Sequence, residues 1–142
     1  MPVRFYVDAD LLGLAKILAG ARSDVTYPGD PGGVCRDRST RPPCPVTDPA
    51  TPDPIWLPMV ANAGWLIITK DKMIQKRPAE IAAVRDNAAR MVALSGSKAN
   101  SLWGQLELVV PNWSRLEAMA VETGPFISRV TSSRVTRLEI GP

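Results

Sequence analysis

Short apolar runs alternate with segments of helical periodicity along most of the chain. Val3–Val7 (VRFYV) is rich in β-branched and aromatic residues, and it predicts a strand that stops at Asp8. Residues 11–19 then place their leucines on one face of a helix. We expect Asp10 to cap this helix and Gly20 to end it.

The same two patterns recur to the end of the sequence. Further strands are predicted at Asp24–Tyr27, Trp65–Lys70, Met91–Leu94, Phe126–Thr131 and Arg134–Ile140. Further helices are predicted at Asp53–Ala63, with Asp53 as N-cap, at Pro78–Ala89 and at Asn100–Glu122. Pro111 interrupts the last segment, which predicts two helices or a kink. The last two strands are joined at Ser132-Ser133 and have the character of a hairpin.

This order of elements predicts an α/β fold with a mostly parallel sheet and a C-terminal β-hairpin. In such sheets reactive groups lie beyond the carboxyl ends of the strands. Asp8 follows the first predicted strand and Asp71 follows the third. Asp53 begins the helix that leads into that third strand, so the pattern alone does not show whether Asp53 lies at the same edge as Asp8 and Asp71.

One long segment has neither the strand pattern nor the helix periodicity. Residues 28–54 contain eight prolines and three glycines, a composition that predicts a long loop with little to contribute to the core. Its arginines, Arg36, Arg38 and Arg41, are candidates for a lid over a bound ligand. Its cysteines, Cys35 and Cys44, are expected to be free thiols, with a loop-closing disulfide or a shared metal as alternatives.

Composition and charge narrow the chemistry. The 142 residues favour one domain over 1–142, and 45% hydrophobic and 22% charged residues are typical of a soluble globular protein. The apolar runs are too short to span a membrane, and the charged start lacks a secretory signal, so we expect a cytoplasmic protein. Histidine is absent, which excludes Ser-His-Asp and Cys-His catalysis. The net charge of +3 rests mostly on arginine, which suits phosphate recognition.

Carboxylates therefore carry the candidate chemistry. Aspartates that converge on one sheet edge repel one another unless a cation lies between them. Hard cations such as Mg²⁺ or Mn²⁺ prefer oxygen ligands, and they assist phosphodiester hydrolysis without any histidine. The alternative is structural, because Asp53 suits a helix N-cap and Asp8 or Asp71 can simply end strands.

Two segments carry a family resemblance. FYVDADLLGLAKIL at 5–18 and TPDPIWLPMVANAGWLIITKDKMI at 51–74 resemble the PIN-domain superfamily of metal-dependent ribonucleases. The stretches ITKDKMIQKRPAEIAAVR at 68–85 and GPFISRV at 124–130 are similar to a small PIN-like family related to VapC toxins. The resemblance implies a three-layer PIN-like sandwich and a Mg²⁺ or Mn²⁺ site at the catalytic residues Asp8, Asp53 and Asp71.

The sequence departs from the family pattern in two places. Full PIN domains carry another acid between the first strand and the later acids, where this chain has its proline-rich loop. Asp10 and Asp48 are candidates for that fourth ligand, and Asp10 serves equally well as a helix cap. The aromatic residue that often follows the last aspartate by two positions is replaced by Met73.

The resemblance also implies partners. As a nuclease, the chain is expected to bind RNA phosphates through Lys70, Lys72, Lys76 and Arg77, although these cations can equally form a solvated rim. As the toxin of a type II toxin–antitoxin system, it would also bind a cognate antitoxin, and the apolar surface of 100–122 offers a face for that partner or for a homodimer. The alternative is a non-catalytic PIN-like module that binds RNA or a protein.

Overall fold

A six-stranded sheet forms the centre of the computed structural model, which describes residues 2–73 and 76–141. From one edge to the other, the strands are β2 (Val25–Thr26), β1 (Phe5–Val7), β5 (Leu66–Lys70), β6 (Arg90–Leu94), β7 (Phe126–Val130) and β8 (Val135–Arg137). Neighbouring strands from β2 to β7 are parallel, and β8 is antiparallel to β7. The mostly parallel sheet and the C-terminal hairpin are confirmed.

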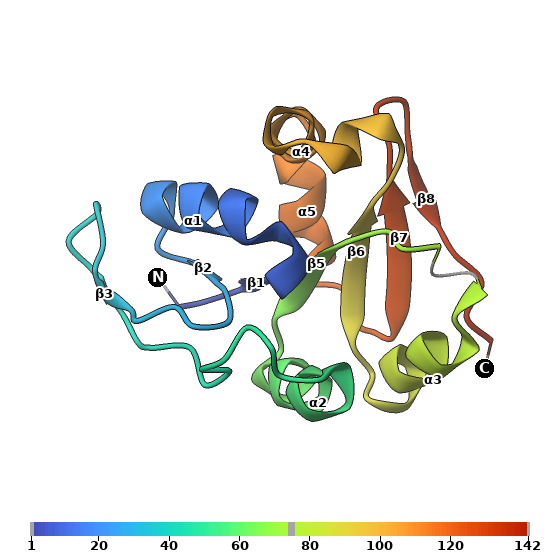
Figure 1. The fold of residues 1–142 in the computed structure, drawn as a ribbon, viewed down its shortest axis with the longest axis horizontal. Coiled ribbons are helices and arrows are strands. Elements are labelled where there is room, and N and C mark those ends of the chain that lie inside the picture. The colour runs from blue at the N-terminus through green and yellow to red at the C-terminus, as the bar shows by residue number, and fades with distance from the viewer. Residues whose placement is uncertain (1, 74–75, 142) are drawn as a thin grey trace.

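Helices cover both faces of this sheet, which gives the expected three layers (Figure 1). One face carries α1 (Leu12–Ala21), α4 (Leu102–Val109) and α5 (Trp113–Met119), and the other carries α2 (Asp53–Ala63) and α3 (Pro78–Asp86). Short 3-10 turns, η1 (Ala9–Leu11) and η3 (Ser97–Asn100), precede α1 and α4. Residues 100–122 thus form two helices with Pro111 between them. Within the described residues, no helix combines the length and the hydrophobicity that crossing a bilayer requires.

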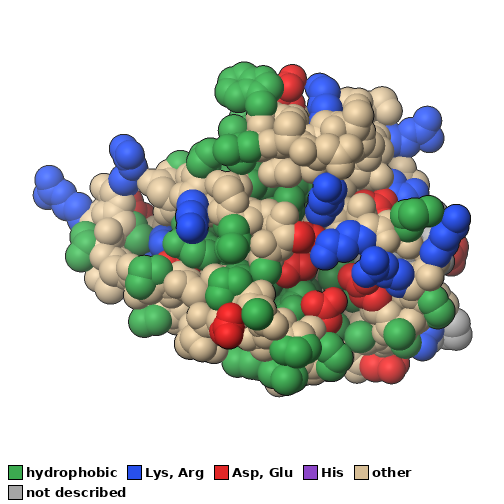
Figure 2. All heavy atoms as spheres, in the orientation of Figure 1, with side chains coloured by type: hydrophobic (Ala, Val, Ile, Leu, Met, Phe, Trp, Pro, Cys, Tyr) green, Lys and Arg blue, Asp and Glu red, His purple; other side chains and the backbone are tan. Residues whose placement is uncertain are grey.

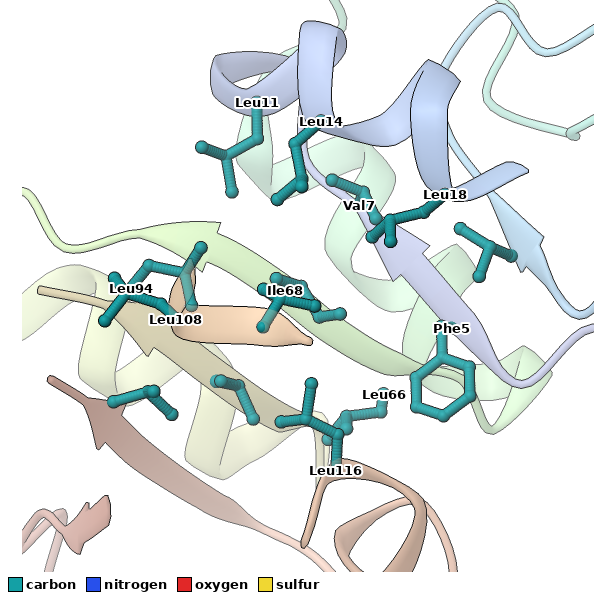
Figure 3. Packing of buried hydrophobic residues seen from close by; sticks show 14 of the residues in the cluster. Phe5, Val7, Leu11, Leu14, Leu18, Leu66, Ile68, Leu94, Leu108 and Leu116 are labelled. Carbon is teal, nitrogen blue, oxygen red and sulfur yellow. The ribbon is translucent and has the colours of Figure 1, made fainter. Parts of the chain in front are cut away.

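The strands divide their side chains between two cores, because successive residues of a strand point to opposite faces. Toward α1, α4 and α5, the sheet contributes Phe5, Val7, Leu66, Ile68 and Leu94, which pack on Leu11, Leu14, Leu18, Leu108 and Leu116 (Figure 3). Toward α2 and α3, it contributes Tyr6, Ile67, Met91 and Ile127, which pack on Trp56, Leu57, Val60 and Val84. Burial on both faces explains why the strands are continuously apolar.

Two predicted helix caps are wrong, and each shift has a local cause. The side chain of Asp8 accepts a hydrogen bond from the backbone N–H of Ala9 at 2.6 Å, so Asp8 caps the 3-10 turn. Asp10 therefore lies inside that turn, and α1 begins only at Leu12. In α2, Pro52 is the N-cap and Asp53 is already in the first helical turn. Neither Asp10 nor Asp53 is therefore needed as a cap.

The proline-rich segment is packed into the domain, contrary to the expectation that it contributes little to the core. It contains a small hairpin of β3 (Gly33–Val34) and β4 (Thr40–Arg41). Arg41 and Asp30 form a buried ion pair in which Nε lies 2.7 Å from Oδ2. Cys44 and Val46 are buried in the core under α2. Both cysteines are free thiols, as expected.

Candidate functional site

Two aspartates meet at the carboxyl end of β1. The backbone N–H of Asp8 continues the sheet by donating to the carbonyl of Ile68 on β5, at 2.9 Å. The 3-10 turn that follows brings the side chain of Asp10 back to the same place. The Thr69 hydroxyl lies 2.9 Å from Oδ2 of Asp8 and 3.2 Å from Oδ2 of Asp10. Strand β5 thus holds both carboxylates through a single side chain.

The two oxygens of Asp10 differ in their surroundings. Besides the Thr69 hydroxyl, Oδ2 faces the backbone N–H of Lys70 at 3.3 Å and the ammonium of Lys72 at 3.2 Å. Oδ1 is buried and has no hydrogen-bond partner among the described residues. Buried polar atoms are nearly always hydrogen-bonded, so an unpartnered carboxylate oxygen marks a place where another group can bind.

Electrostatics at this position disfavour two ionised acids. Burial raises the pKa of Asp8 to about 6, and the charge of Asp10 acts in the same direction. The hydrogen bonds from Thr69 and from the Ala9 N–H oppose this rise. For Lys72, burial lowers the pKa of the ammonium, but the charge and hydrogen bond of Asp10 together with the charges of Asp8 and Asp53 outweigh it, so the net pKa is raised. The site therefore stabilises positive charge beside the carboxylates.

Two further acids lie at the N-terminal turns of α2 and α3. Asp53 accepts a hydrogen bond from the indole N–H of Trp56 at 2.9 Å, and its charge contributes to the raised pKa of Asp8. Glu80 is half-buried, and burial, followed by the charge of Asp53, raises its pKa. Glu80 was not predicted as a site residue from the sequence. Its sequence signals are its place in the family-like stretch at 68–85 and its position in the first turn of a predicted helix.

Asp71 is held by different partners. Its Oδ2 accepts hydrogen bonds from the Ser95 hydroxyl at 3.0 Å and from Nε of Arg129 at 2.9 Å. The side chain of Asp71 is 8% exposed, and Arg129 comes from β7, which is separated from β5 by β6 in the sheet. The structure therefore assigns Asp71 a structural ion pair, while its role in metal binding and catalysis stays a prediction. Asp48, the other candidate for a fourth ligand, closes an exposed turn by accepting from the backbone N–H of Ala50, and no contact among the described residues joins it to Asp8 or Asp10.

The carboxylates of Asp8 and Asp10 suit a cation that keeps part of its hydration shell, rather than one whose ligands all come from the protein. Among residues 2–73 and 76–141, no three acidic or cysteine side chains are grouped so that they could hold a metal ion. Mg²⁺ commonly binds through one or two carboxylates and retains several waters. The pair of Asp8 and Asp10, with one buried oxygen unpartnered, provides such a set. The residues present therefore fit a divalent cation held by two carboxylates.

The predicted phosphate-binding cations lie around these acids. Lys72 pairs with Asp10, and Arg77 lies 3.8 Å from Glu80. Lys70 is half-buried and Lys76 is exposed. Figure 2 shows acidic and basic side chains gathered side by side on one face, over the region where β5 ends in Figure 1.

Two of the three loop arginines lie away from the acids, contrary to the expected lid. Arg41 is buried against Asp30, and Arg36 donates to the carbonyl of Gly20 near the C-terminal end of α1. Asp10 precedes the other end of that helix. A ten-residue helix is about 15 Å long, so these two arginines do not cover the acids.

Comparison with known proteins yields one match. The sequence model of a family described as a PIN like domain matches residues 4–96, about two thirds of the chain. The matched segment contains Asp8, Asp10, Asp53, Asp71 and Glu80. No curated protein and no solved structure matches significantly.

Proposed function

Because the chain belongs to the PIN-like domain family, whose members are nuclease-type modules, we propose that it is a divalent-cation-dependent endoribonuclease. The observation that carries the proposal is the carboxylate pair at the end of β1. Asp8 and Asp10 are held together by Thr69, and Asp10 Oδ1 is buried without a partner among the described residues. An acid pair of this kind is unfavourable by itself; the single ammonium of Lys72 offsets part of its charge, and a divalent cation bound by the pair would offset the rest.

The roles of the residues follow from their contacts. Asp8 and Asp10 hold Mg²⁺ or Mn²⁺, and Asp53 adds negative charge nearby. When bound, such a cation neutralises charge on the scissile phosphate and acidifies a water molecule. The Thr69 hydroxyl and the Lys70 N–H fix the orientation of Asp10. Asp71 fixes the end of β5 against β7 through Arg129 and is retained as a candidate ligand.

The substrate assignment rests on the charges beside the acids. PIN-like domains commonly bind RNA, and Lys70, Lys72, Lys76 and Arg77 are supplied by the segment that immediately follows β5. Half of the Lys72 side chain is exposed, so its ammonium can leave Asp10 for a phosphate when a cation neutralises the acid pair. In this arrangement the basic residues bind the RNA backbone, and the acids face the phosphate that is cleaved.

We extend the proposal to a biological role, the toxin of a type II toxin–antitoxin system. Its support is the sequence similarity to the VapC-related PIN-like family at residues 68–85 and 124–130. A candidate face for the antitoxin, or for a second copy of the chain, is provided by Leu102, Trp103 and Val110, which are exposed large apolar side chains on and beside α4. Apolar side chains gathered in this way are typical of interaction surfaces.

A second candidate function is a non-catalytic PIN-like module that binds RNA or a protein. Two observations favour it: Asp71 is held by Arg129 and Ser95, and no three acids among residues 2–73 and 76–141 are grouped to hold a metal. In this case the acids serve as turn caps and ion-pair partners, and only the basic residues contact a ligand.

The two functions are separated by incubating the purified protein with mixed single-stranded RNA in Mn²⁺ or in EDTA. The nuclease predicts Mn²⁺-dependent cleavage by the wild type and by Asp48→Asn, which changes an exposed acid of the packed loop. It also predicts loss of cleavage in Asp10→Asn purified in the same way, which excludes a contaminating ribonuclease. RNA binding without cleavage, unchanged by Asp10→Asn, would establish the non-catalytic module instead.

A further inference from the structure

A cleft of about 530 Å³ lies between α2 and α3, next to the acids. Its apolar lining includes Pro54, Trp56, Leu57, Ala83 and Met91, and its polar lining comes from Asp53, Arg77 and Glu80. Both helices lie on the same face of the sheet (Figure 1). The volume is within the range of pockets that bind small organic ligands.

Chain direction explains why the polar lining is close to the catalytic edge. Helix α2 leads into β5 and helix α3 leads into β6, so the N-terminal turn of each helix lies toward the carboxyl ends of the strands. Asp53 is in the first turn of α2, and Glu80 is in the first turn of α3. Asp53 lines the cleft, and its charge acts both on Asp8 and on Glu80, so the cleft lies within electrostatic reach of the acid pair.

We propose that this cleft binds a guanine base of the RNA strand that the acid pair cleaves. The proposal rests on the proposed function and names its substrate preference. The two carboxylates in the lining outnumber Arg77 and repel phosphate groups, so the base enters and the phosphates stay outside with Lys70, Lys72 and Lys76. The flat apolar faces of a base match the proline, leucine and methionine side chains that line the cleft.

Guanine is selected by the chemistry of Glu80. The two oxygens of a carboxylate can accept from two adjacent N–H donors, and guanine presents such a pair at N1 and N2 on its Watson–Crick edge. Adenine and cytosine present one amino group next to an acceptor, and uracil presents one N–H between two carbonyls. An adjacent acceptor would face a carboxylate oxygen and be repelled. Guanine is therefore the base whose edge a carboxylate satisfies completely.

The carboxylate of Glu80 is available for this contact. Its ion-pair partner, Arg77, is 3.8 Å away, which is longer than a hydrogen bond. Within the described residues, the Glu80 carboxylate accepts no hydrogen bond. Burial and the charge of Asp53 raise the pKa of Glu80, so a pair of N–H donors would stabilise its ionised form.

The test uses free nucleotides in EDTA, so it does not depend on metal or on cleavage. The probes are guanosine, inosine and uridine monophosphates, followed by NMR at the indole N–H of Trp56, which bonds Asp53 beside the cleft. We expect guanosine monophosphate to shift this signal and to bind roughly tenfold more tightly than inosine monophosphate, which lacks the N2 amino group. Uridine monophosphate should bind more weakly still.

Two variants locate the contact. Glu80→Gln should weaken guanosine monophosphate binding by roughly tenfold and abolish the preference over inosine monophosphate. Glu107→Gln, which makes the same change on α4 at a residue that does not line the cleft, is the control and should leave binding unchanged. Ala83→Leu should block binding by filling the cleft, whereas Ala63→Leu, at the exposed C-terminal end of α2, should not.

Equal binding of all three nucleotides, or guanosine monophosphate binding that survives both Glu80→Gln and Ala83→Leu, would overturn the proposal. So would a cleft that takes up none of them, which would point to a protein side chain as its occupant. Mn²⁺-dependent cleavage without nucleotide binding would reject the base site and leave the nuclease standing. Guanine-selective binding without cleavage would support the base site and reject the nuclease.

Discussion

Asp8 and Asp10 share the single hydroxyl hydrogen of Thr69. The Thr69 oxygen is within hydrogen-bonding distance of both carboxylates, at 2.9 and 3.2 Å, but it can donate its hydrogen to only one of them at a time. One carboxylate oxygen therefore always faces a hydroxyl oxygen without a hydrogen between them. Protonation of Asp8, the ammonium of Lys72 or a bound cation each relieves this arrangement.

The acid pair should reduce the stability of the metal-free protein. Asp10→Asn removes one of two repelling charges and supplies an N–H₂ group beside Asp8, while it loses only a half-exposed ion pair with Lys72. We expect the free energy of unfolding in EDTA at pH 7 to rise by roughly 1–2 kcal/mol. Urea denaturation measures it, with Asp48→Asn as the control for removing an exposed acid. A less stable Asp10→Asn protein would show that the pair is a structural feature.

Asp8 should make stability fall as pH rises between about 4 and about 6. Its pKa in the folded protein is about 6 against an ordinary 3.8, so the folded state binds the proton more tightly than the unfolded state does. The stabilising effect is complete below about pH 4 and is lost as pH rises through about 6. The loss is at most roughly 3 kcal/mol.

Denaturation in EDTA from pH 4 to pH 7.5 measures this loss as the difference between wild type and Asp8→Asn. Asparagine also accepts the Ala9 N–H, so the cap is kept. A difference that does not change with pH would show that Asp8 titrates at its ordinary value.

Thr69→Val should move metal binding to higher pH. The hydrogen bond from Thr69 lowers the pKa of Asp8, so its removal leaves Asp8 protonated over a wider range. Because a carboxylate must be ionised to bind a cation, the pH at which Mn²⁺ raises the melting temperature should increase. Thr69→Ser retains the hydroxyl and should behave like the wild type. Identical pH profiles for valine and serine would mean that the hydroxyl does not act on the pair.

The contributions of Asp71 and Arg129 to the free energy of unfolding should be coupled, because the two side chains form an ion pair. Arg129→Gln leaves the nearly buried Asp71 carboxylate without its guanidinium, and we expect a loss of about 1–3 kcal/mol. Asp71→Asn in the same protein should recover part of this loss. A double-mutant cycle by thermal unfolding gives the coupling energy. Additive effects would show that the contact with Arg129 contributes nothing to stability, which would favour a role for Asp71 as a cation ligand.

The sheet and its helices were predictable because the central strands are short runs dominated by apolar residues, with a turn or helix signal on either side. The run at 66–70 is the clearest case, since it lies between Gly64, which ends α2 with a positive φ, and Asp71. The edge position of Asp8 followed from the end of the first strand. These features depend on local sequence, and local sequence is sufficient to specify them.

The parts that were missed depend on contacts between distant residues. Glu80 belongs with Asp53 only because α2 and α3 run side by side. Arg129 on β7 reaches Asp71 at the end of β5 past the intervening strand β6, and the two residues are 58 positions apart in the sequence. The loop at 28–54 was misjudged because Arg41 is buried by pairing with Asp30, and an isolated arginine in a proline-rich segment predicts exposure. Composition does not reveal such a pairing.

The central claim is that Asp8 and Asp10 together hold one divalent cation. Electron paramagnetic resonance measures it directly, because Mn²⁺ loses its free-ion spectrum when it binds to the protein. The account predicts about one bound Mn²⁺ per chain for the wild type and for Asp48→Asn at pH 7.5, and none at the same concentration for Asp10→Asn. Unchanged Mn²⁺ binding by Asp10→Asn, or no binding by the wild type, would contradict it.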